Sequence, residues 1–222
     1  MILGGVRVVS ALDNQLGYWN GPGAVKTFGH PLEPTWLDRI GRRARILDYG
    51  CGYGRLAGLL TGRGFVDVEG VDVAPNLISH AREMRPSTRF EVLDSPPRLR
   101  HDDQSIDAVF LFAVLTCVPT DDGQRDLVAE LRRVLRPRGL LYLSDLCLQD
   151  DQRNRDRYQD FAAKYGTYGI FETGDGAVCR HHTKEWLHTL LTGFDTTATR
   201  EVRVDTMNGH PVVATQLLAT RT

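Results

Sequence analysis

Residues 45–54 read RILDYGCGYG, and this stretch decides which fold the chain can adopt. A short apolar run ends in three alternating glycines, and a helical stretch with Leu56, Leu59 and Leu60 follows. Glycines allow the backbone to turn sharply, and they let a ligand approach main-chain atoms without meeting a Cβ. The first N–H groups of the helix have no partners within it and favour an anionic group. The stretch therefore predicts a strand–turn–helix unit that binds a nucleotide-like ligand.

The alternation of strand and helix continues as far as residue 146. Residues 107–115 (DAVFLFAVL) are apolar without a break, which is typical of a strand buried on both faces of a parallel sheet. Pro75 suits the first turn of a helix, and Leu127, Val128, Leu131 and Val134 lie on one helical stripe. We predict strands at residues 45–49, 65–73, 89–93, 107–115 and 140–146, with helices between them on both sides of a parallel sheet.

The last third of the chain has a different pattern. A charged helix at 150–164 leads into an insert at 165–182 that is rich in glycine, aromatic residues and histidine, and Thr183 can cap a further helix. Two final strands are joined around Asn208-Gly209, a strong hairpin signal. The predicted fold is α/β: a Rossmann-like three-layer sandwich with a seven-stranded, mostly parallel sheet and a C-terminal antiparallel hairpin. The two strands of that hairpin are predicted at residues 194–204 and 212–219.

Asp72 ends the second predicted strand, 24 residues after Asp48. In doubly wound sheets an acidic side chain at this position accepts hydrogen bonds from both ribose hydroxyls of a bound nucleoside. The spacing and the strand–turn–helix context both fit, so Asp72 is predicted to be a ribose ligand.

With these motifs in order, the chain resembles a class I S-adenosylmethionine-dependent methyltransferase over residues 45–146. Asp48-x-Gly50-x-Gly52-x-Gly54 looks like the loop that wraps the methionine end of the cofactor, and residues 70–72 look like the ribose-binding strand end. Residues 106–109 and 131–140 are similar to the fourth strand and to the helix–turn–fifth-strand segment. The resemblance implies S-adenosyl-L-methionine as cofactor and S-adenosyl-L-homocysteine as product. It assigns the cofactor site to Asp48, Gly50, Gly52, Gly54, Asp72, Val73, Asp94, Ser95 and Phe112.

Asp94 is where the family places an acid against the adenine amino group. Ser95 departs from the larger apolar residue that many members carry there, which affects the expected adenine contact. Two alternatives remain: a nicotinamide enzyme and a cofactor-binding protein without catalysis. The last glycine comes one residue earlier than in G-x-G-x-x-G, and the acid before the first glycine is not part of the dinucleotide fingerprint.

Candidate catalytic residues lie outside the cofactor core. His181 and His182 separate the insert from the next helix, and one of such a pair could face the pocket as a general base. The alternative is that both belong to the end of a strand. His30 is a further candidate for the substrate site, or else an ordinary loop histidine.

Aromatic residues mark two candidate covers over the site. Tyr18 and Trp19 could close over the sulfonium, or they could anchor the N-terminal arm. Tyr168 and Phe171, in the glycine-rich insert, could line a lid, or they could belong to a surface hairpin.

The chain has 222 residues, of which 27 are basic and 28 acidic, and this balance argues against a polyanion as main partner. We predict one domain: an arm at 1–40, a cofactor core at 45–146, a substrate cover at 147–182 and a final helix and hairpin at 183–222. The N-terminus shows no signal-peptide pattern, and the four cysteines have no zinc spacing. Together these features predict a cytoplasmic monomer or homodimer without metal, nucleic acid or membrane partners.

Residues 112–119 lack the N/D-P-P-Y/F signature of enzymes that methylate base or glutamine nitrogens, which favours O- or N-methylation of a small molecule in specialised metabolism.

Overall fold

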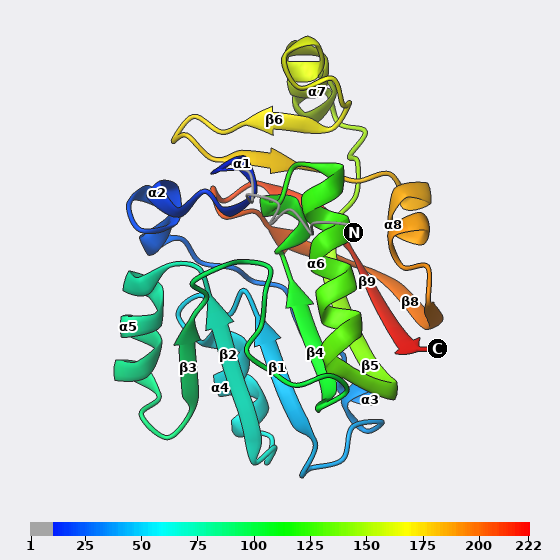
Figure 1. Cartoon of the computed structure of the whole chain (residues 1–222). Coiled ribbons are helices and arrows are strands. Elements are labelled where there is room, and N and C mark those ends of the chain that lie inside the picture. The colour runs from blue at the N-terminus through cyan, green and yellow to red at the C-terminus, as the bar shows by residue number, and fades with distance from the viewer. Residues whose placement is uncertain (1–10) are drawn as a thin grey trace, which may run out of the picture.

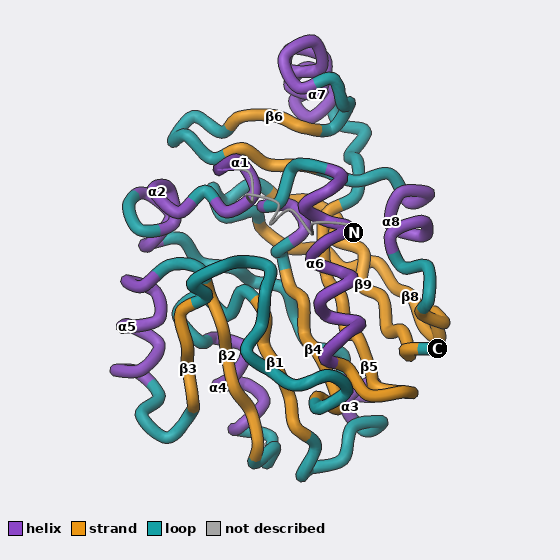
Figure 2. Tube along the Cα trace, in the orientation of Figure 1, coloured by secondary structure: helices purple, strands orange, loops and turns teal. Residues whose placement is uncertain are grey.

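The computed structural model describes residues 11–222, and its centre is one mixed β-sheet (Figures 1 and 2). The strand order is β3-β2-β1-β4-β5-β9-β8; β1 to β5 are parallel, and β9 runs antiparallel to both of its neighbours. The predicted Rossmann-like sheet with a terminal hairpin is confirmed. Within residues 11–222 the sheet consists of β1 (Arg45–Tyr49), β2 (Asp67–Asp72), β3 (Arg89–Val92), β4 (Ile106–Phe112), β5 (Leu135–Leu146), β8 (Phe194–Asp205) and β9 (Pro211–Arg221).

Most side chains of the central strands β1 and β4 are buried because the sheet is covered on both faces. One buried cluster joins Val109 and Leu111 of the sheet to α6 and α8, and a second joins Ile46 and Phe110 to α3, α4 and α5. Figure 1 shows α6 in front of the sheet and α4 behind it. The helices are α1 (Ala11–Asn14), α2 (Leu16–Trp19), α3 (Pro34–Leu37), α4 (Arg55–Thr61), α5 (Pro75–Met84), α6 (Asp121–Val134), α7 (Gln152–Tyr165) and α8 (Lys184–Leu190), with 3-10 turns η1 (Pro22–Val25) and η2 (Leu115–Cys117).

The order of the strands fixes where a ligand can bind. The chain winds from β1 to β2 and β3 on one side, then crosses back to β4 on the other side of β1. The carboxyl ends of β1 and β4 therefore diverge into their connections at a topological switch point, the usual position of a ligand crevice in open α/β sheets.

Strand β5 begins earlier than its sequence predicts. Leu135 pairs with Ile106 directly after α6, and the regular pairing resumes at Leu140 with Ala108. The register shifts because residues 136–139 bulge between these two pairs, and Arg138 there has a φ of 64°. The Pro-Arg-Gly segment is therefore an irregularity within the strand.

The insert forms a small unit of its own. Strands β6 (Ile170–Glu172) and β7 (Val178–Arg180) make a separate antiparallel sheet, which lies beside α7 above the main sheet (Figure 1). Asp151 caps α7 by accepting a hydrogen bond from the Asn154 N–H at 3.1 Å, and Gly166, with a φ of 66°, ends it.

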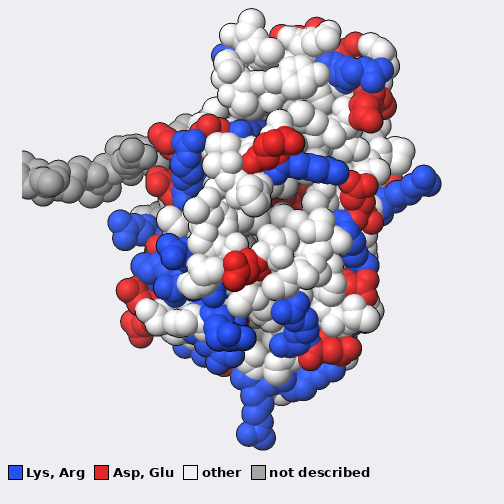
Figure 3. Space-filling view, turned by 90° about the vertical axis from the view of Figure 1, so that its right-hand side faces the viewer, with Lys and Arg blue, Asp and Glu red and all other residues white. Residues whose placement is uncertain are grey.

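The surface mixes charges of both signs. Figure 3 shows Lys and Arg interspersed with Asp and Glu over the face that includes α8 and β8, with basic side chains more frequent at its lower end. From residue 11 onward, no helix combines the length and the apolar character needed to cross a bilayer. The first ten residues of the predicted arm, on which the prediction about a signal peptide depends, lie outside the described residues.

Candidate functional site

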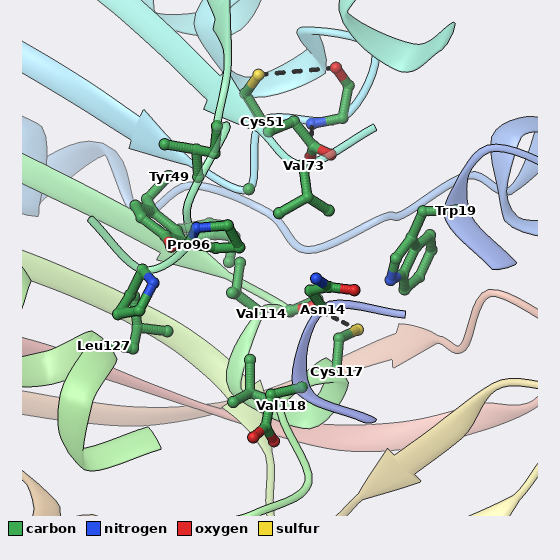
Figure 4. Close-up of a pocket in the computed structure, with 18 of the residues that line it drawn as sticks. Asn14, Trp19, Tyr49, Cys51, Val73, Pro96, Val114, Cys117, Val118 and Leu127 are labelled. Atoms are coloured by element: carbon green, nitrogen blue, oxygen red, sulfur yellow. Dashed lines mark hydrogen bonds between the residues drawn. The ribbon is translucent and has the colours of Figure 1, made fainter. Parts of the chain in front are cut away.

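A cavity of about 610 Å³ opens at the carboxyl ends of β1, β2 and β4. Its volume lies within the range typical of small-molecule sites. Figure 4 shows Tyr49, Cys51 and Val73 around one part of it and Trp19 and Asn14 around another. The principal lining residues are Asp13, Asn14, Trp19, Phe28, Asp48, Tyr49, Gly50, Cys51, Gly52, Asp72, Val73, Leu93, Pro96, Pro97, Phe112, Ala113, Val114, Cys117, Val118, Asp126 and Leu127.

The glycine-rich turn between β1 and α4 has the backbone that its sequence predicts. Gly50, Gly52 and Gly54 have φ values of 71°, 52° and 76°, in the region that favours glycine. The N–H groups of Gly50 and Cys51 both donate to the Val71 carbonyl, at 2.8 and 3.0 Å, which ties the turn to β2. A Cβ at Gly52 would have no atom within 4 Å, because this residue borders the open cavity. Gly54 does not line the cavity, and Phe90 packs where its Cβ would lie.

Asp72 lines the cavity at the end of β2. Its Oδ2 accepts the Gly52 N–H and its Oδ1 accepts the Ala74 N–H, each at 2.9 Å. Burial raises the pKa of this carboxyl, and the backbone hydrogen bonds oppose that rise. Each carboxylate oxygen has a further lone pair, so Asp72 can hold the turn in place and still accept hydrogen bonds from a ligand.

Asp48 is a buried carboxyl group with an unused acceptor. It lies in the central strand β1, is 2% exposed and lines the cavity, and its Oδ2 has no hydrogen-bond partner among the described residues. Burial raises its pKa to about 7, although the nearby Arg55 charge and a hydrogen bond from the Ala57 backbone lower it. A cationic group in the cavity would satisfy this oxygen, and the ammonium of a methionine moiety is such a group.

The structure does not bring Asp94 or Ser95 to the cavity. The Asp94 side chain is 64% exposed and forms an ion pair with Arg100, while the cavity is lined by Leu93, Pro96 and Pro97 on either side of the two residues. The two residues predicted to contact the adenine therefore lie outside the cavity lining. Val73 and Phe112, in contrast, both line the cavity as predicted.

The N-terminal arm supplies another wall of the cavity. Asp13, Asn14, Trp19 and Phe28 line it, whereas Tyr18 is turned away, with its hydroxyl 3.2 Å from Asp175 of the insert. Of the two arm residues predicted at the site, only Trp19 is placed there. The arm is fixed at its start because Asp13 accepts hydrogen bonds from the Thr120 N–H and hydroxyl, at 3.0 and 2.7 Å.

The insert supports the arm and does not line the cavity. Phe171 is buried with Trp19, Tyr18 and Tyr158 in one cluster, and the Arg157 guanidinium lies 3.5 Å from the centre of its ring. Tyr168 is exposed and packs edge-on against Tyr158. The predicted lid residues thus lie behind the wall that the arm forms.

The three predicted histidines all lie outside the cavity lining. His181 is buried, with its Nδ1 2.5 Å from the Tyr158 hydroxyl, and burial holds its pKa well below the usual range. His182 is buried with its Nε2 3.5 Å from Asp145, on a segment that bridges to Cys147 beside β5. His30 is buried against the Ser144 hydroxyl at 2.7 Å, and burial lowers its pKa to about 4. Neither His181 nor His182 faces the cavity, so the expectation of a pocket-facing base in this pair needs correction: both side chains pack inside the protein.

Sequence reasoning missed the acidic side chains from α1 and α6. Asp13 and Asp126 line the cavity, although neither belongs to a glycine-rich or strand-end motif. The acids at positions 121, 122 and 126 were a possible signal, but acids are common in the first turn of any helix.

The comparisons with known proteins agree with this geometry. Residues 47–143 match the family described as "Methyltransferase domain". A solved structure of S-adenosylmethionine-dependent methyltransferases from Methanosarcina mazei superposes with a TM-score of 0.81 and 25% identity, over 86% of this chain and 99% of that one. Residues 47–143 therefore match a methyltransferase domain, and the fold is similar to that of S-adenosylmethionine-dependent methyltransferases.

Curated relatives of this methyltransferase domain share about a third of its sequence or less. A ubiquinone biosynthesis O-methyltransferase from Xanthomonas oryzae pv. oryzae is 32% identical over 146 residues, which is 62% of this chain and 58% of that protein. The methyltransferase GfsG from Streptomyces halstedii is 26% identical over 144 residues, 60% of this chain and 50% of that protein. The chain thus spans less than three-fifths of the length of these relatives.

The residues of the cavity fit S-adenosylmethionine. Gly52 leaves open space beside the turn, Asp48 presents an unpartnered buried oxygen, and Asp72 keeps acceptor capacity next to the apolar Val73. Asp48 and the turn would hold the methionine end and Asp72 the ribose. The bound cofactor would supply an electrophilic methyl group on a sulfonium.

Proposed function

We propose that this chain is an enzyme that transfers the methyl group of S-adenosylmethionine to an oxygen or nitrogen atom of a small molecule. The observation that carries the proposal is one cavity that is lined partly by the glycine-rich turn and β2 and partly by the N-terminal arm. Gly52 and Asp72 line it where the methyltransferase fold holds its cofactor, and Trp19 and Phe28 of the arm line it elsewhere. One space of about 610 Å³ can therefore hold donor and acceptor together.

The protein's main contribution to such a transfer is alignment. Methyl transfer is an in-line displacement, and good alignment can lower its barrier by roughly 7–11 kcal/mol. Val114 packs closely against the Gly50 backbone, because a Cβ there would lie 2.4 Å from Val114 Cγ2. Ala113 has a φ of 56° and places Val114 against the turn. The Ala113 backbone N–H donates to the Ser144 carbonyl at 2.7 Å. The turn and the segment after β4 thus fix one another, and the arm lines another part of the cavity.

The walls of the cavity indicate the class of acceptor. Trp19 and Phe28 offer aromatic surface, and Val114, Cys117 and Val118 replace the polar signature that holds base and amide nitrogens. The named activity of the Xanthomonas relative, O-methylation in ubiquinone biosynthesis, supports a hydroxyl on an apolar or aromatic small molecule as the first acceptor to test. Among the cavity-lining residues there is no histidine, so a proton leaving the acceptor would pass to a carboxylate or to water.

Incubation with methyl-labelled S-adenosylmethionine and a panel of small phenols and amines tests the proposal. We expect label in an acceptor with the wild-type chain and at least a tenfold loss with Asp72→Ala, because the ribose loses its acceptor. Asp195→Asn, on the exposed start of β8, is the matched control and should keep the wild-type rate. Cofactor binding without transfer to any member of a broad acceptor panel and metabolite extract would favour the non-catalytic alternative.

A further inference from the structure

The turn after β4 forms part of the cavity wall, and buried side chains from other elements hold its backbone. Cys117 and Val118 line the cavity, and Figure 4 shows both on the side of it away from Cys51. The Gln124 side chain of α6 donates to the carbonyls of Leu115 and Val118, at 3.0 and 2.7 Å. Two carbonyl groups of this turn are therefore fixed by α6.

Asp145, near the end of β5, holds the same turn through an N–H group. Its Oδ1 accepts hydrogen bonds from the Thr116 N–H at 3.1 Å and from the Leu146 N–H at 2.8 Å. Asp145 and Thr116 are both buried. Because Thr116 directly precedes Cys117, the position of this carboxyl group sets the position of the cavity wall.

The imidazole of His182 is the partner of Asp145. Its Nε2 lies 3.5 Å from Asp145 Oδ1, at the distance of an ion pair but longer than a normal hydrogen bond. Among the described residues, Asp145 Oδ2 and both ring nitrogens of His182 have no hydrogen-bond partner. Buried polar groups with unused capacity cost free energy, and apolar residues of similar volume would occupy the same place at less cost. The pair is therefore better explained by the turn that it holds than by the stability of the fold.

We propose that Asp145 and His182 are positioning residues for the methyl acceptor: Asp145 fixes the turn that carries Cys117 and Val118, and His182 holds Asp145. The inference rests on the proposed function, since it concerns the space that an acceptor would occupy. Neither Asp145 nor His182 lines the cavity, so the pair acts through the turn and does not touch the reacting atoms. Loss of the pair should change acceptor binding and leave cofactor binding unchanged.

Alkylation of Cys117 by N-ethylmaleimide tests the inference without an acceptor. The thiol donates to the Ala113 carbonyl at 3.4 Å, and burial raises its pKa well above the usual range, so the wild-type thiol should react slowly. Asp145→Ala removes the acceptor of the Thr116 N–H and should make the reaction about tenfold faster. Asp145→Asn keeps an acceptor oxygen and should react at a rate close to that of wild type.

Two controls separate a loosened turn from a loosened fold. Peptide mass spectrometry gives the rate at each cysteine, and the buried Cys51 and Cys179 should not react faster in any variant. Thr215 is buried and pairs with Asp145 across β9 and β5, and its hydroxyl donates to Cys147 Sγ at 3.2 Å. Thr215→Val therefore removes a buried polar group beside the pair and should keep the wild-type rate at Cys117.

A double variant, Asp145→Val with His182→Leu, removes the pair without leaving either member unpaired. Its melting temperature should equal or exceed that of wild type, because apolar residues often replace a buried ion pair without loss of stability. Cys117 should nevertheless react about tenfold faster than in wild type. With the compound of the phenol and amine panel that accepts label best, the acceptor KM should rise about tenfold, whereas the calorimetric Kd for S-adenosylhomocysteine should stay within twofold of wild type.

The outcomes distinguish this inference from the proposed function. If Cys117 reacts at the wild-type rate in the double variant, or if Asp145→Asn loosens the turn as much as Asp145→Ala, the pair does not position the turn. Faster reaction at every cysteine would mean that the pair only supports the fold. If Asp145→Ala does not fold, the double variant decides. A panel without any labelled compound would count against the proposed function, while the thiol rates would still show whether the pair holds the turn.

Discussion

The Asp48 carboxyl is buried in a central strand without a full set of partners. Neighbouring parallel strands contribute apolar side chains to the sheet, and one oxygen of Asp48 makes no hydrogen bond with the described residues. A buried acceptor of this kind costs free energy, so its presence beside a cavity indicates a ligand group that completes it. This residue should therefore reduce the stability of the ligand-free protein and contribute to cofactor binding.

Asp48 should contribute to the pH dependence of stability by lowering the unfolding free energy of the free protein as pH rises. Its pKa is raised from 3.8 in the unfolded reference to about 7 in the fold, so between these values the folded state binds more protons than the unfolded state. The unfolding free energy then decreases with pH, by at most about 1.4 kcal/mol per pH unit from this group. Asp48→Asn should remove this slope between pH 4 and 7.

Urea unfolding at several pH values measures the effect. Asp195→Asn, at an exposed aspartate on β8, should keep the wild-type slope. An Asp48→Asn protein whose stability changes with pH as steeply as that of wild type would show that Asp48 is ionised in the fold at low pH.

At the scale of elements, the N-terminal arm depends on the insert for its position. The Gln15 side chain donates to the carbonyls of Cys117 and Val178, at 3.0 and 2.8 Å, and accepts the Val178 N–H at 2.8 Å. The 3-10 turn after β4, the arm and β7 are thus joined through one amide. This arrangement explains why the aromatic residues of the insert pack behind the arm and not in the cavity.

Removal of this amide should loosen the arm. Gln15→Ala loses three hydrogen bonds, and we expect hydrogen exchange of residues 11–28 to become about tenfold faster, since tenfold corresponds to roughly 1.4 kcal/mol. Mass spectrometry of deuterium uptake measures this. Gln152→Ala, on the exposed start of α7, provides the control. Unchanged uptake over 11–28 would mean that Trp19 and Tyr18 hold the arm without Gln15.

Local sequence patterns predicted the helices and strands well. They predicted the tertiary contacts of individual side chains less well. The alternation of 45–146 gave the strands of the parallel sheet, because most side chains of β1, β2 and β4 are buried in it. The turn 50–54 and Asp72 were predictable because glycine and an acid are required at those points of the backbone. Tyr168, Phe171 and the histidine pair were not placed correctly, because their contacts depend on how the insert folds back onto the arm.

At the scale of the whole molecule, the pair His181-His182 joins the insert to the main sheet. The His181 ring lies against Phe171, and its Nδ1 contacts Tyr158 of α7. The His181 backbone N–H donates to the Gly169 carbonyl at 2.9 Å. The neighbouring His182 N–H donates to the Leu146 carbonyl of β5 at 3.0 Å. The two histidines therefore connect three parts of the fold, which accounts for their burial.

Replacement of His181 should lower stability more than catalysis. His181→Ala leaves the Tyr158 hydroxyl without its close partner and should reduce the unfolding free energy by about 1–3 kcal/mol. Turnover per folded molecule should change less than twofold. His188→Ala, on the exposed side of α8, is the control and should melt with wild type. A fully stable His181→Ala protein with lost turnover would establish a catalytic histidine.

The most direct test is a crystal structure of this chain grown with excess S-adenosylhomocysteine. The adenosyl group should lie in the cavity, with its ribose hydroxyls on the carboxylate of Asp72 and its amino acid end beside Asp48 and the backbone of residues 50–54. Clear density for the ligand at any other place, or a cavity filled by the protein's own side chains under saturating ligand, would contradict the account.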